Sequence, residues 1–113
     1  MAEELPAGSL PLTVQQWERY ESSEGGQHWW AWAVWVDGPD DVLDRIKEVE
    51  WTLHPTFPNP TRTITDRSSK FRLETGGWGV FPIFAHVRMK DGTRFKVRHQ
   101  LTLTYPDGRP NTA

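Results

Sequence analysis

Two short segments of this chain carry the residue types that could hold a ligand. The first is Leu53–Arg62, in which His54, Thr56 and Phe57 stand among three prolines, and the second is Gly76–Phe81, in which a tryptophan stands among glycines. Proline fixes φ and cannot donate a backbone hydrogen bond, so the first segment predicts a rigid loop. Glycines let the second backbone pass close to a ligand while the indole projects outward. Two loops that each present an aromatic ring can wall a narrow, flat pocket, and the pattern therefore predicts a binding site.

The other reactive side chains form no catalytic pattern. The chain has no cysteine, which excludes a disulfide framework, a thiolate zinc site and a cysteine nucleophile. The four histidines, His28, His54, His86 and His99, are too widely spaced for a His-x-Glu or His-x-x-x-His metal motif. The glycines around Trp78 lack the lysine of a phosphate-binding loop, and no Gly-x-Ser-x-Gly element is present. We therefore expect a binding module rather than an enzyme, with no cofactor and no metal.

Strands are the elements that must position the two loops. Apolar and polar residues alternate with a period of two, which is typical of strands with one buried side. The alternating segments lie at 12–20, 29–36, 49–53, 70–74, 81–89 and 94–105. Asp91-Gly92 predicts a tight hairpin turn between the last two, and only the start of 42–54 leaves room for a helical turn. Six to eight strands without a longer helix predict an all-β fold, an immunoglobulin-like antiparallel β-sandwich.

Length and composition set the domain organisation. A chain of 113 residues has room for a single domain with one core, which we place at residues 10–105. Residues 1–9 and 106–113 are rich in proline, glycine and charge, and we expect a flexible N-terminal segment and a flexible C-terminal tail. The sequence contains no run of 18 apolar residues, so no membrane partner is expected. The prediction is a soluble cytoplasmic protein, or a nuclear one if the source is eukaryotic.

The faces of the predicted strands offer alternatives to loop binding. Trp29 and Trp35 lie on the second face of the 29–36 segment, where they could form an interface with another protein. A short basic row at 94–98 could contact nucleic acid, but the net charge is −2 and no exposed aromatic residues are expected among the outward-facing side chains of the row. Nucleic acid is therefore not an expected partner. His99 falls on the apolar row of the same segment and is expected to be a hydrogen-bonded core histidine.

The two loop motifs, Leu53–Arg62 and Gly77–Phe81, resemble those of the YEATS domain family. Trp32 and the Gly38-Pro39 turn also match the family pattern, and the likeness extends over about residues 10–105, in the stand-alone form that occurs in prokaryotes. The resemblance implies an immunoglobulin-like sandwich whose end loops bind acylated lysine, in eukaryotes chiefly on histone tails. For a prokaryotic member it also implies a link to signalling and defence systems, so a signalling or defence protein is a second expected partner.

The resemblance also implies which residues contact the ligand. The implied positions are His54, Thr56, Phe57, Gly77, Trp78, Gly79, Phe81 and His28. His54 matches the family's pocket histidine, and Thr56 matches its hydroxyl residue. Phe57 and Trp78 match the two sandwiching aromatic rings, and Gly77 and Gly79 match the glycine before and the small residue after the second ring. Phe81 and His28 match two further aromatic wall positions. One departure stands out, because the family's usual histidine two residues before the strand tryptophan is Trp30 here.

Elementary chemistry supports the same class of ligand. An acyl-lysine side chain ends in a flat, neutral amide, and stacking between two aromatic faces contributes roughly 0.5–1.5 kcal/mol beyond area burial. The ligand amide has one donor and one acceptor that need partners. The Thr56 hydroxyl can supply one partner, and the backbone N–H of Trp78 can supply the other. Unmodified lysine would have to desolvate an ammonium group with only cation–π attraction to offset that cost. Acylated lysine on a protein or peptide is therefore the expected partner.

Each of these residues also has a purely structural interpretation. His54 could brace the loop, Phe57 could plug it against the core, and Phe81 begins an apolar row and belongs more naturally to the core. The alternative function is a scaffold module that binds an unmodified partner through its tryptophan-rich sheet face. A Trp78→Ala substitution separates the two, because only the acyl-lysine hypothesis predicts that ligand binding is then lost without unfolding.

Overall fold

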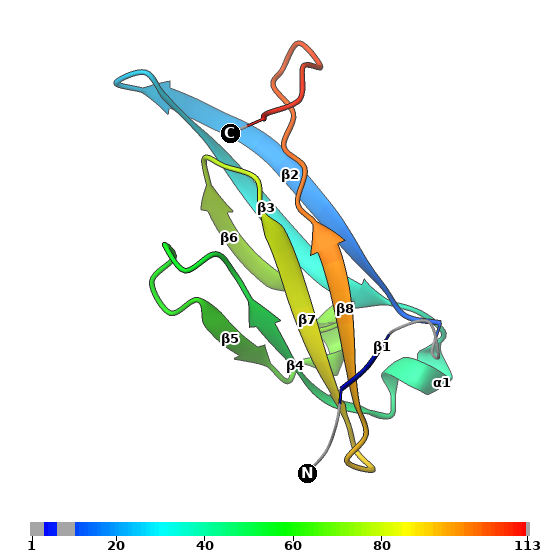
Figure 1. Cartoon of the computed structure of the whole chain (residues 1–113). Coiled ribbons are helices and arrows are strands. Elements are labelled where there is room, and N and C mark those ends of the chain that lie inside the picture. Colours follow the sequence, from blue (N-terminus) through cyan, green and yellow to red (C-terminus); the bar gives the residue numbers. More distant parts are fainter. Residues whose placement is uncertain (1–3, 7–10, 113) are drawn as a thin grey trace.

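The computed structural model describes residues 4–6 and 11–112, which form two packed β-sheets (Figure 1). The five-stranded sheet has the order β1 (Glu4–Pro6), β8 (Arg94–Gln100), β7 (Pro82–Met89), β4 (Ile46–Thr52) and β5 (Thr61–Ile64). The three-stranded sheet has the order β2 (Thr13–Glu24), β3 (Gln27–Asp37) and β6 (Leu73–Gly77). Neighbouring strands pair antiparallel, except that β1 runs parallel to β8. The predicted all-β, immunoglobulin-like sandwich is confirmed.

The core lies between the sheets and is built from the alternating residues of each strand. Along β3, every second residue from Trp30 to Val36 is buried, and β7 buries Ile83, Ala85, Val87 and Met89 in the same way. Trp30, Trp32 and Trp51 are at most 1% exposed. A large aromatic side chain buries roughly 150–250 Å², so these three residues supply much of the apolar contact that holds a chain without disulfides together.

The second face of β3, the central strand of its sheet, is also largely apolar, with Trp29, Ala31, Ala33 and Trp35 along it. Ala33 is fully buried there, and Trp35 is half-buried beneath the guanidinium of Arg72, which lies 4.9 Å from the indole ring. Trp29 and Trp17 remain 44% and 40% exposed. The predicted tryptophan-rich face is therefore partly covered by charged side chains.

The structure corrects several predicted strands: β2 runs on to Glu24, β4 begins at Ile46, and β5 was not expected. Two further corrections have a clear physical cause. The strand expected at 70–74 begins at Leu73, because Lys70 and Phe71 have positive φ values of 58° and 61° after the short 3₁₀ helix η2 (Arg67–Ser69). The strand expected at 94–105 ends at Gln100. Beyond it, the side chains of Gln16 and Glu18 on β2 replace a neighbouring strand. Gln16 accepts from the N–H of Thr102 and donates to its carbonyl, and Glu18 accepts from the N–H of Thr104.

The C-terminal residues fold back on the sandwich and are not the loose tail that the composition predicts. Thr104 forms a β-bridge with Pro110, the Tyr105 N–H donates to the carbonyl of Arg109, and the Asn111 N–H donates to the carbonyl of Leu103. We call residues 103–111 the C-terminal hairpin. At the other end, Glu4–Pro6 pairs with β8, while the remaining positions of the predicted flexible segment 1–9 lie outside the described residues. Glu4–Pro6 and part of the C-terminal hairpin therefore contact the sandwich although they lie outside the predicted domain span of 10–105.

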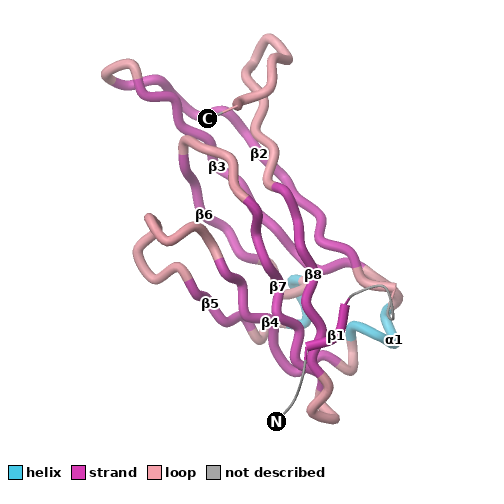
Figure 2. Tube along the Cα trace, in the orientation of Figure 1, coloured by secondary structure: helices cyan, strands magenta, loops and turns pink. Residues whose placement is uncertain are grey.

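The loops singled out by the sequence gather at one end of the sandwich. The β4–β5 loop, the β6–β7 loop, the β2–β3 hairpin and the C-terminal hairpin lie toward this end in Figure 2. The helical turn α1 (Asp40–Leu43), which falls close to the position that the sequence left open for one, and the β7–β8 turn lie at the opposite end.

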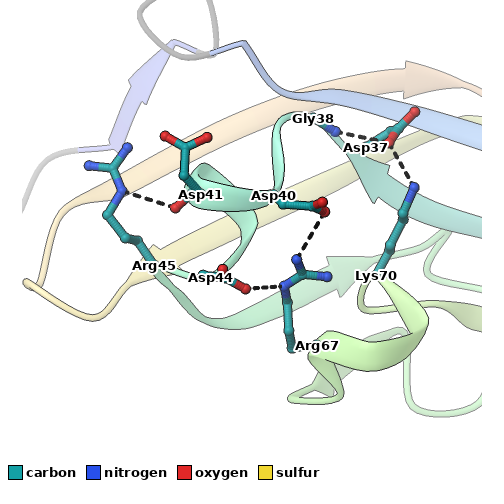
Figure 3. A network of polar contacts seen from close by, with 8 residues as sticks. All are labelled: Asp37, Gly38, Asp40, Asp41, Asp44, Arg45, Arg67 and Lys70. Atoms are coloured by element: carbon teal, nitrogen blue, oxygen red, sulfur yellow. Dashed lines mark hydrogen bonds and ion pairs between the residues drawn. The ribbon is translucent and has the colours of Figure 1, made fainter.

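A network of charged side chains lies at that opposite end, around α1 (Figure 3). Arg67 bridges Asp40 at 3.2 Å and Asp44 at 2.9 Å, which ties α1 to the segment that leads into β6. Lys70 pairs with Asp37 at 3.1 Å, and this contact joins the same segment to the end of β3. The hydrogen bond from Lys70, with that from the Gly38 N–H, lowers the pKa of the Asp37 carboxyl.

Candidate ligand-binding site

The β4–β5 loop and the β6–β7 loop together line a cavity of about 700 Å³. Seven of the eight predicted site residues line it, and they are His54, Thr56, Phe57, Gly77, Trp78, Gly79 and Phe81. Glu21, Trp29, Ala31 and Arg62 contribute further wall positions. The volume lies within the range of roughly 300–1,000 Å³ that is usual for small-molecule and cofactor sites.

Backbone hydrogen bonds hold the proline-rich β4–β5 loop closed. The Leu53 N–H donates to the carbonyl of Pro60 at 2.7 Å, and the Phe57 N–H donates to the carbonyl of His54 at 3.0 Å. Arg62 donates from its guanidinium to the carbonyls of Asn59 and Pro58, each at 3.1 Å. These bonds pair the carbonyls of His54, Pro58, Asn59 and Pro60, although three residues of the loop have no N–H of their own. The loop is therefore a fixed wall, as the prolines predict.

His54 sets the direction of the Thr56 hydroxyl. The Thr56 N–H donates to His54 Nδ1 at 3.2 Å, so Nδ1 carries a lone pair and the imidazole proton is on Nε2. The Thr56 hydroxyl lies 2.8 Å from the same Nδ1 and must be the donor of that contact. Its oxygen lone pairs are then left to accept a hydrogen bond from a group in the cavity. His54 thus both braces the loop and lines the cavity.

An aromatic cluster forms the floor beneath the β4–β5 loop. The ring of Phe57 lies 5.3 Å from that of Phe81 and 6.2 Å from that of Trp32. Phe81 is only 7% exposed, so it belongs to the core and reaches the cavity with one edge. Phe57 is half-buried and has both of the roles that the sequence left open: it packs against the core and it lines the cavity.

Glycines allow the β6–β7 loop to pass close to these rings. A Cβ at Gly77 would lie 3.4 Å from Phe57 and 3.8 Å from the indole nitrogen of Trp32. That buried indole N–H has no hydrogen-bond acceptor among the described residues. Trp78 is 51% exposed, which confirms that its indole projects from the loop.

His28 is the one predicted site residue that the structure places elsewhere. Its Nδ1 lies 2.7 Å from the hydroxyl of Tyr20, and its ring lies 5.0 Å from that of Tyr105. Neighbouring residues of a strand point to opposite faces, so Trp29 takes the place at the cavity that His28 was expected to fill. The indole nitrogen of Trp29 would lie 2.9 Å from a Cβ at Gly76, and the ring covers that glycine from outside. Strand alternation was the signal that could have identified Trp29.

The electrostatics of the cavity are mixed. Glu21 is paired with Arg19 at 2.8 Å, and the Arg62 guanidinium lies 5.9 Å from the Phe57 ring centre.

The described residues contain no group of three histidines, cysteines or carboxylates that could hold a metal ion. No helix within 4–6 and 11–112 is long and apolar enough to cross a membrane. The arrangement can stack a flat group and supply a few hydrogen bonds.

Comparison with known proteins identifies the family of this site. A sequence model of the prokaryotic YEATS domain matches residues 30–102, a span that contains both loops. The chain belongs to the YEATS domain family. The YEATS chain is 36% identical over 91 residues to the Protein AF-9 homolog of Eremothecium gossypii, a match that covers 74% of this chain and 43% of that protein. With the Protein AF-9 homolog of Saccharomyces cerevisiae it shares 36% identity over 92 residues, which cover 76% and 40% of the two. It thus spans less than half the length of these relatives.

Solved structures of YEATS domains share the fold. The yeast Yaf9 YEATS domain bound to H3K27ac superposes with a TM-score of 0.68 and 26% identity, covering 83% of this chain and 72% of the other. The same domain recognising an H3K122suc peptide gives a TM-score of 0.60 and 27% identity, over 88% and 81% of the two chains.

Proposed function

We propose that this YEATS domain is a non-enzymatic module that binds acylated lysine in the cavity between its β4–β5 and β6–β7 loops. The observation that carries the proposal is the His54–Thr56 pair, which turns a hydrogen-bond acceptor toward a cavity lined by Phe57 and Trp78. The solved complexes of the related Yaf9 domain with H3K27ac and H3K122suc support this class of ligand.

Each part of an acyl-lysine has a counterpart in the cavity. The flat amide stacks against the Phe57 ring and the Trp78 indole, and its N–H donates to the Thr56 hydroxyl oxygen. Its carbonyl oxygen has two lone pairs and accepts from backbone N–H groups of the glycine-flanked loop, that of Trp78 among them. A lysine ammonium would lose its hydration there, and Glu21, the one carboxylate among the described residues that line the cavity, already pairs with Arg19. The acylated form is therefore preferred.

The test is an NMR titration of labelled protein with a short lysine peptide in unmodified, acetylated and crotonylated forms. We expect shifts at Thr56, Phe57 and Gly77–Gly79 with the acylated peptides alone. Trp78→Ala should abolish them while the protein stays folded. Trp17→Ala is the matched control, because Trp17 is comparably exposed on the same domain but does not line the cavity. If a saturating concentration of acylated peptide produces no NMR shifts at the loop residues, the proposal is wrong.

The tryptophan-face alternative has no comparable support in the structure. Trp35 is covered by Arg72, and Trp29 lines the cavity rather than a separate surface. The basic row is also partly occupied, because Lys96 lies 4.6 Å from the ring of Phe84 and the nearby Arg88 pairs with Glu48 at 3.5 Å.

A further inference from the structure

The C-terminal hairpin makes one contact with the cavity loops that the proposed function does not use. The side-chain amide of Asn111 donates from Nδ2 to the carbonyl oxygen of Trp78 at 2.7 Å. Asn111 is 8% exposed, and it is the one buried polar residue among the described positions. A buried amide placed on the backbone of a loop that is otherwise rich in glycine calls for a physical reason.

The hairpin that carries Asn111 is itself anchored in the sandwich. The Asn111 N–H donates to the carbonyl of Leu103 at 2.7 Å, and the indole N–H of Trp30 donates to the carbonyl of Thr104 at 2.8 Å. The ring of Tyr105 packs 5.0 Å from that of Trp30. Trp30 is fully buried on β3 and pairs in register with Gly77, the residue directly before Trp78. The hairpin therefore holds Asn111 at a fixed place relative to the loop.

The bond to the Trp78 carbonyl also fixes the next N–H. In a trans peptide, the carbonyl of one residue and the N–H of the following residue point in opposite directions, and no described peptide bond is cis. Gly79 lines the cavity, whereas no residue of the C-terminal hairpin does. A carbonyl drawn toward Asn111 thus turns the Gly79 N–H away from the hairpin. No backbone carbonyl of the described residues accepts from that N–H.

We propose that Asn111 is a positioning residue for ligand binding: it orients the Trp78–Gly79 peptide so that the Gly79 N–H can donate to the carbonyl of an acyl amide. The inference rests on the proposed function for the identity of the ligand, and on the Asn111–Trp78 bond for the orientation. The glycines leave this loop many backbone conformations, and the Asn111 bond selects one of them before the ligand arrives.

The experiment compares Asn111→Ala and Asn111→Asp in the full chain. Asp has the shape of Asn but places a carboxylate against the Trp78 carbonyl, whereas Ala leaves the carbonyl without a donor. We expect both to shift the Trp78 and Gly79 amide signals of the ligand-free protein and to speed their hydrogen exchange. The Kd for an acetyl-lysine peptide should rise about three- to tenfold, the effect of one hydrogen bond.

Acidification adds a readout that loss of packing cannot reproduce. In Asn111→Asp, protonation of the introduced carboxylate gives an O–H that can donate to the Trp78 carbonyl, and burial at this position raises the pKa of that carboxyl above its ordinary value of about 3.9. The signals of this variant should therefore return toward wild type as the pH is lowered from about 7 to about 4. Asn111→Ala should show no such recovery, and wild type at each pH is the reference. Asp107→Asn is the matched control. It weakens the cap on Arg109 at the tip of the same hairpin without touching Trp78, and should leave the loop signals in place.

Two results would overturn the inference. One is an Asn111→Ala protein whose Trp78 and Gly79 amides match wild type in shift and exchange. The other is unchanged peptide affinity in both variants while Trp78→Ala abolishes binding. If wild type binds no acylated peptide, the proposed function fails, and the amide signals of the ligand-free protein still decide whether Asn111 sets the orientation of the Gly79 N–H.

Discussion

The direction of one hydroxyl carries the selectivity of the proposed complex at the residue scale. Because His54 Nδ1 already accepts from the Thr56 N–H, the Thr56 hydroxyl can only donate to it, and its oxygen is left as an acceptor. An amide N–H fits that acceptor, whereas a group without a donor does not. In the proposed complex, the imidazole would therefore act on the ligand through the threonine.

Thr56→Val should weaken binding of an acetylated peptide because it leaves the ligand N–H without an acceptor. The expected loss is about 1–2 kcal/mol, or roughly five- to thirtyfold in Kd by calorimetry. Thr56→Ser keeps the hydroxyl and should retain most of the affinity. Equal affinities for the valine and serine variants would show that the hydroxyl does not contact the ligand.

Two adjacent glycines should respond differently to the same methyl group. A Cβ at Gly76 would lie 2.8 Å from the Trp30 carbonyl oxygen and 2.9 Å from the indole of Trp29, so Gly76→Ala must displace a strand or a ring. We expect a loss of about 1–3 kcal/mol in the free energy of unfolding by urea titration. Gly77→Ala meets its first atom at 3.4 Å and should cost clearly less. A smaller loss at Gly76 than at Gly77 would contradict this packing.

Residue types and spacing were sufficient to predict most of the cavity wall. The prolines and glycines restrict or free the backbone in ways that do not depend on the rest of the fold, and seven of the eight predicted residues line the cavity. The prediction for His28 did not hold because its side chain lies with Tyr20 and Tyr105, and the alternation of side chains along β3 assigns the neighbouring Trp29 to the cavity instead. No sequence pattern could have predicted the role of Asn111, because its partner is a backbone carbonyl 33 residues away along the chain.

At the scale of elements, the segment between β5 and β6 is shaped by a left-handed turn that the sequence does not mark with glycine. Lys70 and Phe71 adopt positive φ, and the Lys70 carbonyl accepts from the Val36 N–H. Such conformations are costly for residues other than glycine and persist where the surroundings enforce them. The pair Asp37–Lys70 and the fully buried Phe71 ring are contacts that do so. The late start of β6 could therefore not be predicted from alternation alone.

Lys70→Met should raise the pKa of the Asp37 carboxyl back toward its ordinary value of 3.8, because the Lys70 hydrogen bond is the main cause of its lowering. A lowered carboxyl pKa contributes stability above the ordinary value, and that contribution is lost as the pH falls through the pKa of the folded state. Carbon-13 NMR of the carboxyl signal measures the shift directly. Asp66, whose pKa is lowered by Ser68 instead, is the internal control and should not move.

At the scale of the whole molecule, the two sheets are joined by side chains beside the main core. His99 on β8 lies 2.8 Å from the Gln16 side-chain oxygen on β2, which also accepts from the Thr102 N–H. The imidazole Nε2 therefore carries a proton and donates to Gln16. This bears out the prediction of a hydrogen-bonded histidine on the apolar row, although His99 is half-buried rather than enclosed.

Burial lowers the pKa of His99 below its ordinary value of 6.5. The unfolded chain then binds the proton more readily than the folded one. The contribution of His99 to stability is therefore complete above about pH 6.5 and is lost as the pH falls toward the folded pKa, by at most about 1.4 kcal/mol per pH unit. Urea titrations between pH 7.5 and about pH 5 should show this slope in wild type and a smaller one in His99→Gln. Identical slopes would remove His99 as the cause.

The half-exposed indole of Trp78 also makes the domain its own optical sensor. An indole in water emits at longer wavelength than one in apolar surroundings, and Trp30, Trp32 and Trp51 are already enclosed. A flat ligand laid against Trp78 would exclude water from that ring and move its emission toward the blue. Substituting phenylalanine for Trp17, the well-exposed indole that does not line the cavity, would leave the two indoles of the cavity wall, Trp78 and Trp29, as the main sources of such a change. Candidate ligands could then be screened by fluorescence without attaching a dye.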